Sequence, residues 1–170
     1  MHRYQAYNAA MATTAATAKV TTGTAIKTML QIATQSTRQL QVISWGYSLD
    51  AAPAAAGTGI VELIQTDVAA TVTAHAASGV QPLDPNAPAS LMTLGTTGTG
   101  FTATGEGATT ATRLFDATQL LGVSGGAQGN EYAYQFMPDE RPIVAVSKFL
   151  RVRVTLSAPV NMLCWVCWDE

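Results

Sequence analysis

Two strand patterns run back to back at the end of the chain, and they constrain the fold more than any other part of the sequence. In residues 150–156, leucine and valine alternate with arginine and threonine, so an extended backbone sends the apolar side chains to one face and the polar ones to the other. After a break at Pro159, residues 161–168 are apolar on both faces. The first pattern predicts a half-buried strand, and the second predicts a last strand that is covered on both sides.

Runs of the same kind, separated by turn residues, recur from residue 25 onward. Strands are predicted at residues 26–32, 40–49, 60–65, 68–74, 101–104 and 132–136, and a short strand or turn is predicted at 91–94. The strand at 40–49 is predicted to direct its bulkier side chains into the core, namely Ile43, Trp45, Tyr47 and Leu49. About eight strands and no persuasive helix predict an all-β fold, a single antiparallel sandwich that is jelly-roll-like.

The N-terminal residues 1–24 are rich in alanine and threonine, and residues 9–18 have neither a helical nor a strand period. Such a segment buries too little apolar surface to offset the entropy of ordering its backbone. We therefore expect a flexible N-terminal arm at residues 1–24, followed by one sandwich domain at residues 25–170. The alternative is that the arm becomes ordered when it docks against a partner.

The surface predicted by the composition is weakly charged. Only 12% of the 170 residues are charged, and the formal net charge is -2. This balance gives no electrostatic reason to expect direct binding of nucleic acid or of an anionic membrane. No stretch approaches the roughly 20 apolar residues that span a bilayer, and the N-terminus has no signal-peptide pattern, so synthesis in the cytoplasm is expected.

The residue types that carry catalysis or bind metals are scarce. His2 and His75 are the only histidines, and Cys164 and Cys167 are the only cysteines. Residues three apart on a strand point to opposite faces, so the two cysteines are predicted to be small buried side chains and not a metal or redox pair. We expect no catalytic residue, no cofactor and no metal, and therefore no enzyme.

Two sets of side chains in the C-terminal strands are candidates for contacts with a partner. Arg151 and Arg153 share the polar face of one strand, where they are either solvated or placed to bind carboxylates of a partner. In the last strand, Trp165 points to one face while Val166 and Trp168 point to the other. A single sandwich core covers only one of these faces, so the other needs a loop of the same chain or a neighbouring subunit.

Five short segments resemble those of a family of small virion structural proteins from tailed bacteriophages. In order along the chain they are ISWGYSLD at 43–50, ELIQTD at 62–67, FTATGEG at 101–107, KFLRVRV at 148–154 and NMLC at 161–164. The resemblance extends across residues 25–170. It implies a capsid decoration (cement) protein, made in the host cytoplasm, that binds the exterior of an icosahedral head as a homotrimer with the major capsid protein as its partner.

With that resemblance, Trp165, Val166 and Trp168 are expected near the subunit contact, and Arg151 and Arg153 are expected to dock on the capsid. Another virion component, such as a tail or head-fibre module, is the first alternative. A carbohydrate-binding jelly roll is the second, and it requires exposed, coplanar tryptophans along a groove.

Overall fold

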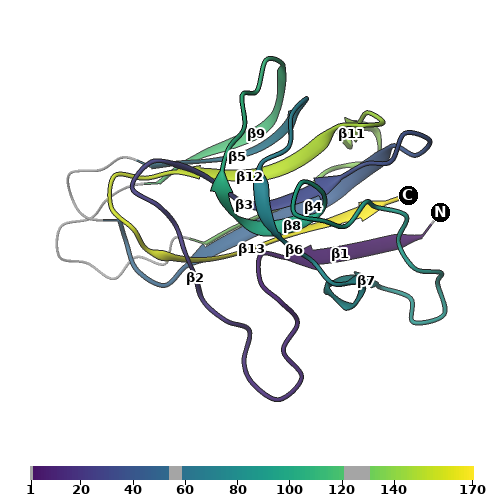
Figure 1. Ribbon diagram of the computed structural model, residues 1–170, viewed down its shortest axis with the longest axis horizontal. Helices are drawn as coiled ribbons and strands as arrows, with labels where there is room; N and C mark the ends of the chain where they lie inside the picture. The colour runs from purple at the N-terminus through teal and green to yellow at the C-terminus, as the bar shows by residue number, and fades with distance from the viewer. Residues whose placement is uncertain (1, 54–58, 121–130) are drawn as a thin grey trace.

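Two antiparallel β-sheets pack face to face as a sandwich, which confirms the predicted fold class (Figure 1). The computed structural model describes residues 2–53, 59–120 and 131–170. The only helical elements in these residues are two short 3-10 turns, Ala77–Gly79 and Pro138–Glu140. The jelly-roll connectivity itself stays a prediction.

The seven-stranded sheet contains both ends of the chain. Its strand order is β10 (Glu131–Gln135), β4 (Leu40–Leu49), β13 (Asn161–Asp169), β1 (Arg3–Tyr7) and β7 (Val80–Pro82), with β11 (Ile143–Val144) also paired to β4 and β2 (Val20–Thr21) also paired to β13. The termini lie side by side at one end of the sandwich because β1 and β13 are antiparallel neighbours (Figure 1).

The six-stranded sheet forms the second layer. Its strand order is β6 (Thr71–Ala74), β8 (Gly100–Gly105), β3 (Ile26–Ala33), β12 (Phe149–Thr155), β5 (Gly59–Thr66) and β9 (Thr112–Leu120). The alternation predicted for the strand at 150–156 is confirmed, because Leu150, Val152 and Val154 are buried in the core between the sheets.

The core-facing side of β4 differs from the prediction at one end. Trp45, Tyr47 and Leu49 belong to the core as expected, but Val42 joins them in place of Ile43. The cause is a register shift opposite β13, where Cys167 pairs with Ser44 and Trp168 pairs with Val42. Ile43 is the extra residue of this bulge, which reverses the side-chain alternation on either side of it.

The prediction of a flexible arm at residues 1–24 is wrong for its first part. Residues Arg3–Tyr7 form β1, which pairs with β13 on one side and β7 on the other. Tyr4 and Ala6 are buried, and the Tyr4 ring stacks on Trp168 at a centroid distance of 6.1 Å. β1 is therefore part of the sandwich, so a boundary between arm and domain at residue 24 does not hold.

Most other predicted strands are present, with two differences in extent. The run at 68–74 is a strand only over Thr71–Ala74, and the run at 91–94 makes isolated bridges at Thr93 and Leu94. The strands β1 and β9 and the shorter β2, β7 and β11 lie outside the predicted ranges. Nine strands of five or more residues occur in the described residues, so the predicted number of about eight is slightly low.

Candidate interaction surface

One face of the seven-stranded sheet points away from the core, and we call it the outer face. Side chains alternate along a strand, so the residues between the core positions of β1, β4, β10 and β13 make up this face. Its central members are Gln5, Tyr7, Ser44, Gly46, Ser48, Ala133, Gln135, Leu163, Trp165 and Cys167. None of these side chains is charged, whereas Arg3 and Glu131 lie at opposite margins of the face.

Trp165 lies at the centre of the outer face. It pairs with Tyr7 of β1 on one side and with Gly46 of β4 on the other. A Cβ atom at Gly46 would lie 3.0 Å from two atoms of the indole and 2.7 Å from the carbonyl oxygen of Tyr132. Only glycine therefore leaves room for the indole to lie across β4, as expected for a glycine at a close approach. The result is a half-buried aromatic ring on an uncharged surface.

The predicted interface set divides between two environments. Trp165 lies on the outer face, but Val166 and Trp168 are 1% and 0% exposed and belong to the core. Their assignment to an oligomer interface is therefore wrong. The alternation was predicted correctly, but the core takes up the face with Cys164, Val166 and Trp168, so Trp165 is the member of the set that remains half-buried on the outer face.

Arg151 is not available to a capsid, because segments that precede it in the chain cover it completely. Its side chain is 0% exposed, and its guanidinium donates hydrogen bonds to the carbonyl oxygens of Val68 and Glu106. It also pairs with the Glu106 carboxylate at 3.3 Å. Glu106 in turn accepts hydrogen bonds from the backbone N–H and the hydroxyl of Thr28, at 2.5 and 2.6 Å.

Arg153 also has a carboxylate partner within the chain. Its Nε and Nη2 atoms both lie 2.9 Å from Glu62 Oε2 on the neighbouring strand β5. The predicted role of Arg151 in capsid docking is therefore wrong, because its side chain is fully buried. The docking role of Arg153, whose side chain is 17% exposed, stays a prediction.

The buried His75 side chain forms a hydrogen bond with the last residue of β1. Its Nε2–H donates to the carbonyl oxygen of Tyr7 at 2.7 Å, and its ring packs against Phe101 at 4.8 Å. Burial lowers the pKa of His75 because it disfavours the charged ring, while the hydrogen bond to Tyr7 opposes this shift. The described residues contain no group of three or more His, Cys, Asp or Glu side chains that could hold a metal ion.

The lowered pKa of His75 predicts a loss of stability in mild acid. Below about pH 6.5 the unfolded chain binds a proton at His75 and the folded chain does not, so the free energy of unfolding falls by up to about 1.4 kcal/mol per pH unit. His75→Gln keeps a donor for Tyr7 and should remove this part of the pH dependence. Urea unfolding of both proteins between about pH 7.5 and 5.5 measures it. Identical pH dependence in the two proteins would contradict the expectation.

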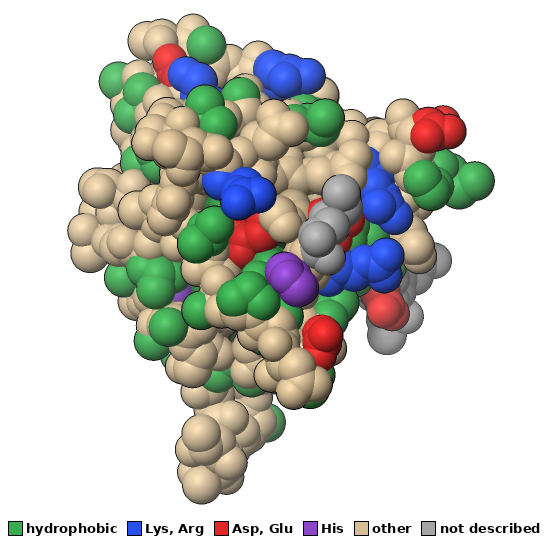
Figure 2. Space-filling model, turned by 90° about the vertical axis from the view of Figure 1, so that its right-hand side faces the viewer, with side chains coloured by type: hydrophobic (Ala, Val, Ile, Leu, Met, Phe, Trp, Pro, Cys, Tyr) green, Lys and Arg blue, Asp and Glu red, His purple; other side chains and the backbone are tan. Residues whose placement is uncertain are grey.

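The end of the sandwich with the termini differs from the outer face, because it carries charges of both signs (Figure 2). Here the buried carboxylate of Asp169 lies 3.7 Å from Arg3 and 3.6 Å from Arg141. These pairs connect β1, β13 and the segment before β11. Arg3 and Arg141 are therefore both paired with Asp169 within the chain.

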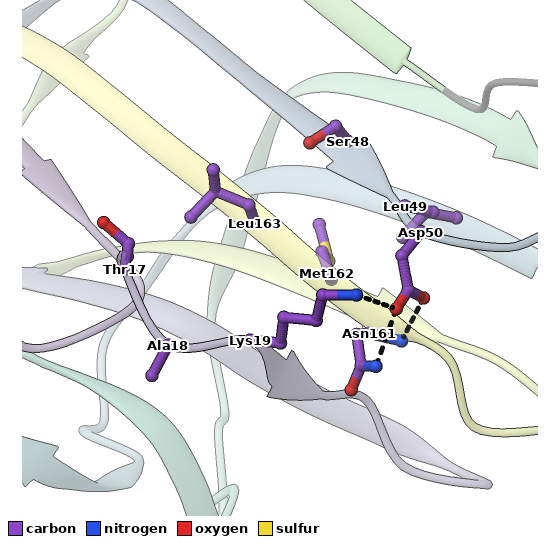
Figure 3. Close-up of a pocket in the computed structure, with 9 residues that line it drawn as sticks. All are labelled: Thr17, Ala18, Lys19, Ser48, Leu49, Asp50, Asn161, Met162 and Leu163. Atoms are coloured by element: carbon purple, nitrogen blue, oxygen red, sulfur yellow. Dashed lines mark hydrogen bonds and ion pairs between the residues drawn. The ribbon is translucent and has the colours of Figure 1, made fainter. Parts of the chain in front are cut away.

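A pocket of about 220 Å³ lies beside the other end of the outer face (Figure 3). It is bounded by residues 17–19, by the end of β4 and by the start of β13, with Leu163 facing Thr17 across it. Lys19 and Asn161 both donate to the Asp50 carboxylate, at 3.1 and 2.7 Å. These contacts lower the pKa of Asp50, with the Asn161 hydrogen bond as the largest cause.

No family model, curated protein or solved structure matches this chain. Among residues 2–53, 59–120 and 131–170, no helix is long and apolar enough to cross a membrane. Trp165 was predicted from the sequence as an interface residue, whereas Gln5 and Tyr7, its neighbours on the outer face, were not. The alternation of Arg3, Gln5 and Tyr7 with the apolar Tyr4 side chain and Ala6 was the signal that could have found them.

Proposed function

We propose that this chain is a virion structural protein, a decoration protein that binds the exterior of an icosahedral phage head and associates with copies of itself. The observation that carries the proposal is the uncharged outer face with Trp165 at its centre. Protein interfaces are depleted of charge and enriched in aromatic residues at their cores. The resemblance of the five segments to phage virion proteins supplies the identity of the partner, the major capsid protein.

The outer face can supply part of a stable contact. Strands lie about 4.8 Å apart and rise about 3.3 Å per residue, so β1, β4, β10 and β13, which have 5, 10, 5 and 9 residues, cover roughly 460 Å². This is somewhat more than half of the roughly 800 Å² that a standard interface buries per partner. The carbohydrate-binding alternative has less support, because Trp45 and Trp168 are fully buried and only Trp165 reaches the surface.

The role of the outer face in docking is tested by placing a charge on it at a position that the fold tolerates. Ala133 is exposed on β10 and pairs with Gly46, so Ala133→Arg puts a cation beside Trp165 without entering the core. We expect this variant to bind purified phage heads that lack the chain at least about tenfold more weakly than wild type, measured by co-sedimentation. Thr155→Arg, which is exposed on the six-stranded sheet, is the matched control and should bind normally.

Each outcome of this test is informative. Equal binding of the two variants would exclude the outer face as the docking surface. A wild-type protein that does not bind heads would contradict the decoration function. Electron cryomicroscopy of whole particles then distinguishes density on the head shell, which the proposal expects, from density on a tail or head fibre.

A further inference from the structure

Residues 10–19 are an insertion into a sheet edge that is otherwise continuous. β1 follows β13 as far as Asn8, whose backbone N–H donates to the carbonyl oxygen of Cys164 at 3.0 Å. The chain returns to the same side of β13 at Val20, which pairs with Met162. Only Leu163 separates these two contact points, and Ala9 is sufficient to span it. The fold could therefore continue from Ala9 directly to Val20 in register.

Both ends of the insertion are held firmly. The Asn8 side chain is 0% exposed, donates to the carbonyl oxygen of Met162 and accepts from the N–H of Cys164, each at 2.9 Å. On the return side, Thr22 exchanges two hydrogen bonds with Val160, at 2.8 and 3.0 Å. The residues on either side of the loop are thus part of the sandwich.

The loop between these anchors contributes little to its own sandwich. Residues 10–19 are all exposed, and in Figure 1 the segment between β1 and β2 extends away from the sheets. Compact loops with close ends are often stabilised by their own side chains and are frequently functional. This loop has only alanine, threonine, Met11 and Lys19, so it cannot pack on itself. Met11 is its one large apolar side chain and is 40% exposed.

We infer that residues 10–19 are a self-association loop, which inserts Met11 into the pocket of Figure 3 on a second copy of this chain. The inference rests on the self-association that the proposed function includes. The loop is uncharged from Ala10 to Ala18. The pocket combines the side chains of Leu49, Met162 and Leu163 with the base of the same copy's loop, residues 17–19, and its two charged groups, Lys19 and Asp50, pair with each other. A flexible methionine side chain suits such a shallow apolar site.

The loop is long enough to reach a neighbouring subunit. Ten extended residues span about 35 Å, so a loop closed at both ends reaches about 17 Å from its base. This reach exceeds the roughly 10 Å thickness of a packed sheet layer, so the tip can enter a neighbouring subunit. The tip of the loop at Met11 and the pocket at the base of the loop are different parts of one copy. A contact from the tip of one copy to the pocket of the next is therefore heterologous, and it closes into a ring when the rotation between copies permits, as in a trimer.

The first experiment joins Ala9 to Val20, which removes the loop together with the part of the pocket wall that residues 17–19 form. We expect a folded protein with thermal stability close to wild type, because the Asn8 and Thr22 contacts remain, and sedimentation as a monomer at concentrations where wild type is an oligomer. Ala15→Arg should weaken association at least about tenfold. Ala89→Arg, in another exposed loop, is the matched control and should not.

The second experiment identifies the receptor. The protein is produced with a photoreactive amino acid at position 11, once labelled with nitrogen-15 and once unlabelled. The two samples are mixed, allowed to associate and then irradiated. Crosslinks from position 11 to residues 161–163 that join one labelled and one unlabelled peptide are the expected result. Crosslinks within single copies only, or none to this segment, would overturn the inference.

These assays contain no phage particles, so they are separate from the test of the proposed function. A wild-type protein that is monomeric at its highest soluble concentration, or a loop deletion that associates like wild type, overturns the self-association loop. An intact oligomer that fails to bind heads overturns the decoration function and leaves the loop inference in place.

Discussion

Trp168→Ser is expected to destabilise the fold of each subunit by about 3–5 kcal/mol, and any loss of association is a consequence of that. The indole is fully buried, lies in the core between the sheets and stacks on Tyr4. Burying a Trp side chain contributes roughly 4–6 kcal/mol, from 150–250 Å² at about 25 cal/mol per Å². Thermal unfolding should show a decrease in Tm of roughly 6–20 °C for a chain of this size.

Trp165→Ser is the matched control, because Trp165 lies on the same strand and points to the opposite face. It is half-buried and outside the core, so we expect a clearly smaller loss of stability than for Trp168→Ser. Its main effect should be on association or head binding, measured on the folded protein. A Trp168→Ser protein with an unchanged unfolding transition but a lower oligomeric mass would contradict this account and restore Trp168 to the interface.

The fold was predictable where a regular side-chain pattern continues over many residues. β12 and β13 follow the alternation in residues 150–168, and β4 begins and ends where its pattern does. β1 was missed because five residues beside an alanine- and threonine-rich segment give a short pattern, whose stability comes from pairing with β13 at the far end of the chain. Ile43 was misplaced because a bulge depends on the partner strand, which local sequence does not specify.

The candidate site was predictable only in part for a related reason. Strand alternation correctly separates Trp165 from Val166 and Trp168, but it does not say which face the core takes up. The insertion at residues 10–19 is recognisable only from the pairing of Asn8 and Val20 with neighbouring positions of β13. The expected mobility of residues 9–18 in the free protein stays a prediction, and slow amide exchange there would contradict it.

Arg151→Met is expected to cost about 3 kcal/mol of folding stability, even though the substituted residue lies on the polar face of its strand. Removing the guanidinium leaves the carbonyl oxygens of Val68 and Glu106 without their donor, at about 1–3 kcal/mol for each buried group. It also removes the cation beside the Glu106 carboxylate, which is only 23% exposed. The loss should appear as a lower urea midpoint and as faster amide exchange in residues 67–71 and 105–107, the segments that Arg151 holds against the six-stranded sheet.

Arg153→Met provides the comparison, because Arg153 lies two residues away on the same face of β12. Its side chain is 17% exposed and its partner Glu62 is 21% exposed, so solvent screens the pair and we expect a loss of at most about 1 kcal/mol. Arg151→Lys separates charge from geometry, since an ammonium keeps the charge but cannot reproduce the spread of donors that reaches both carbonyl oxygens. Equal losses for Arg151→Met and Arg153→Met, with no local change in exchange, would show that Arg151 is not the residue that fixes these segments.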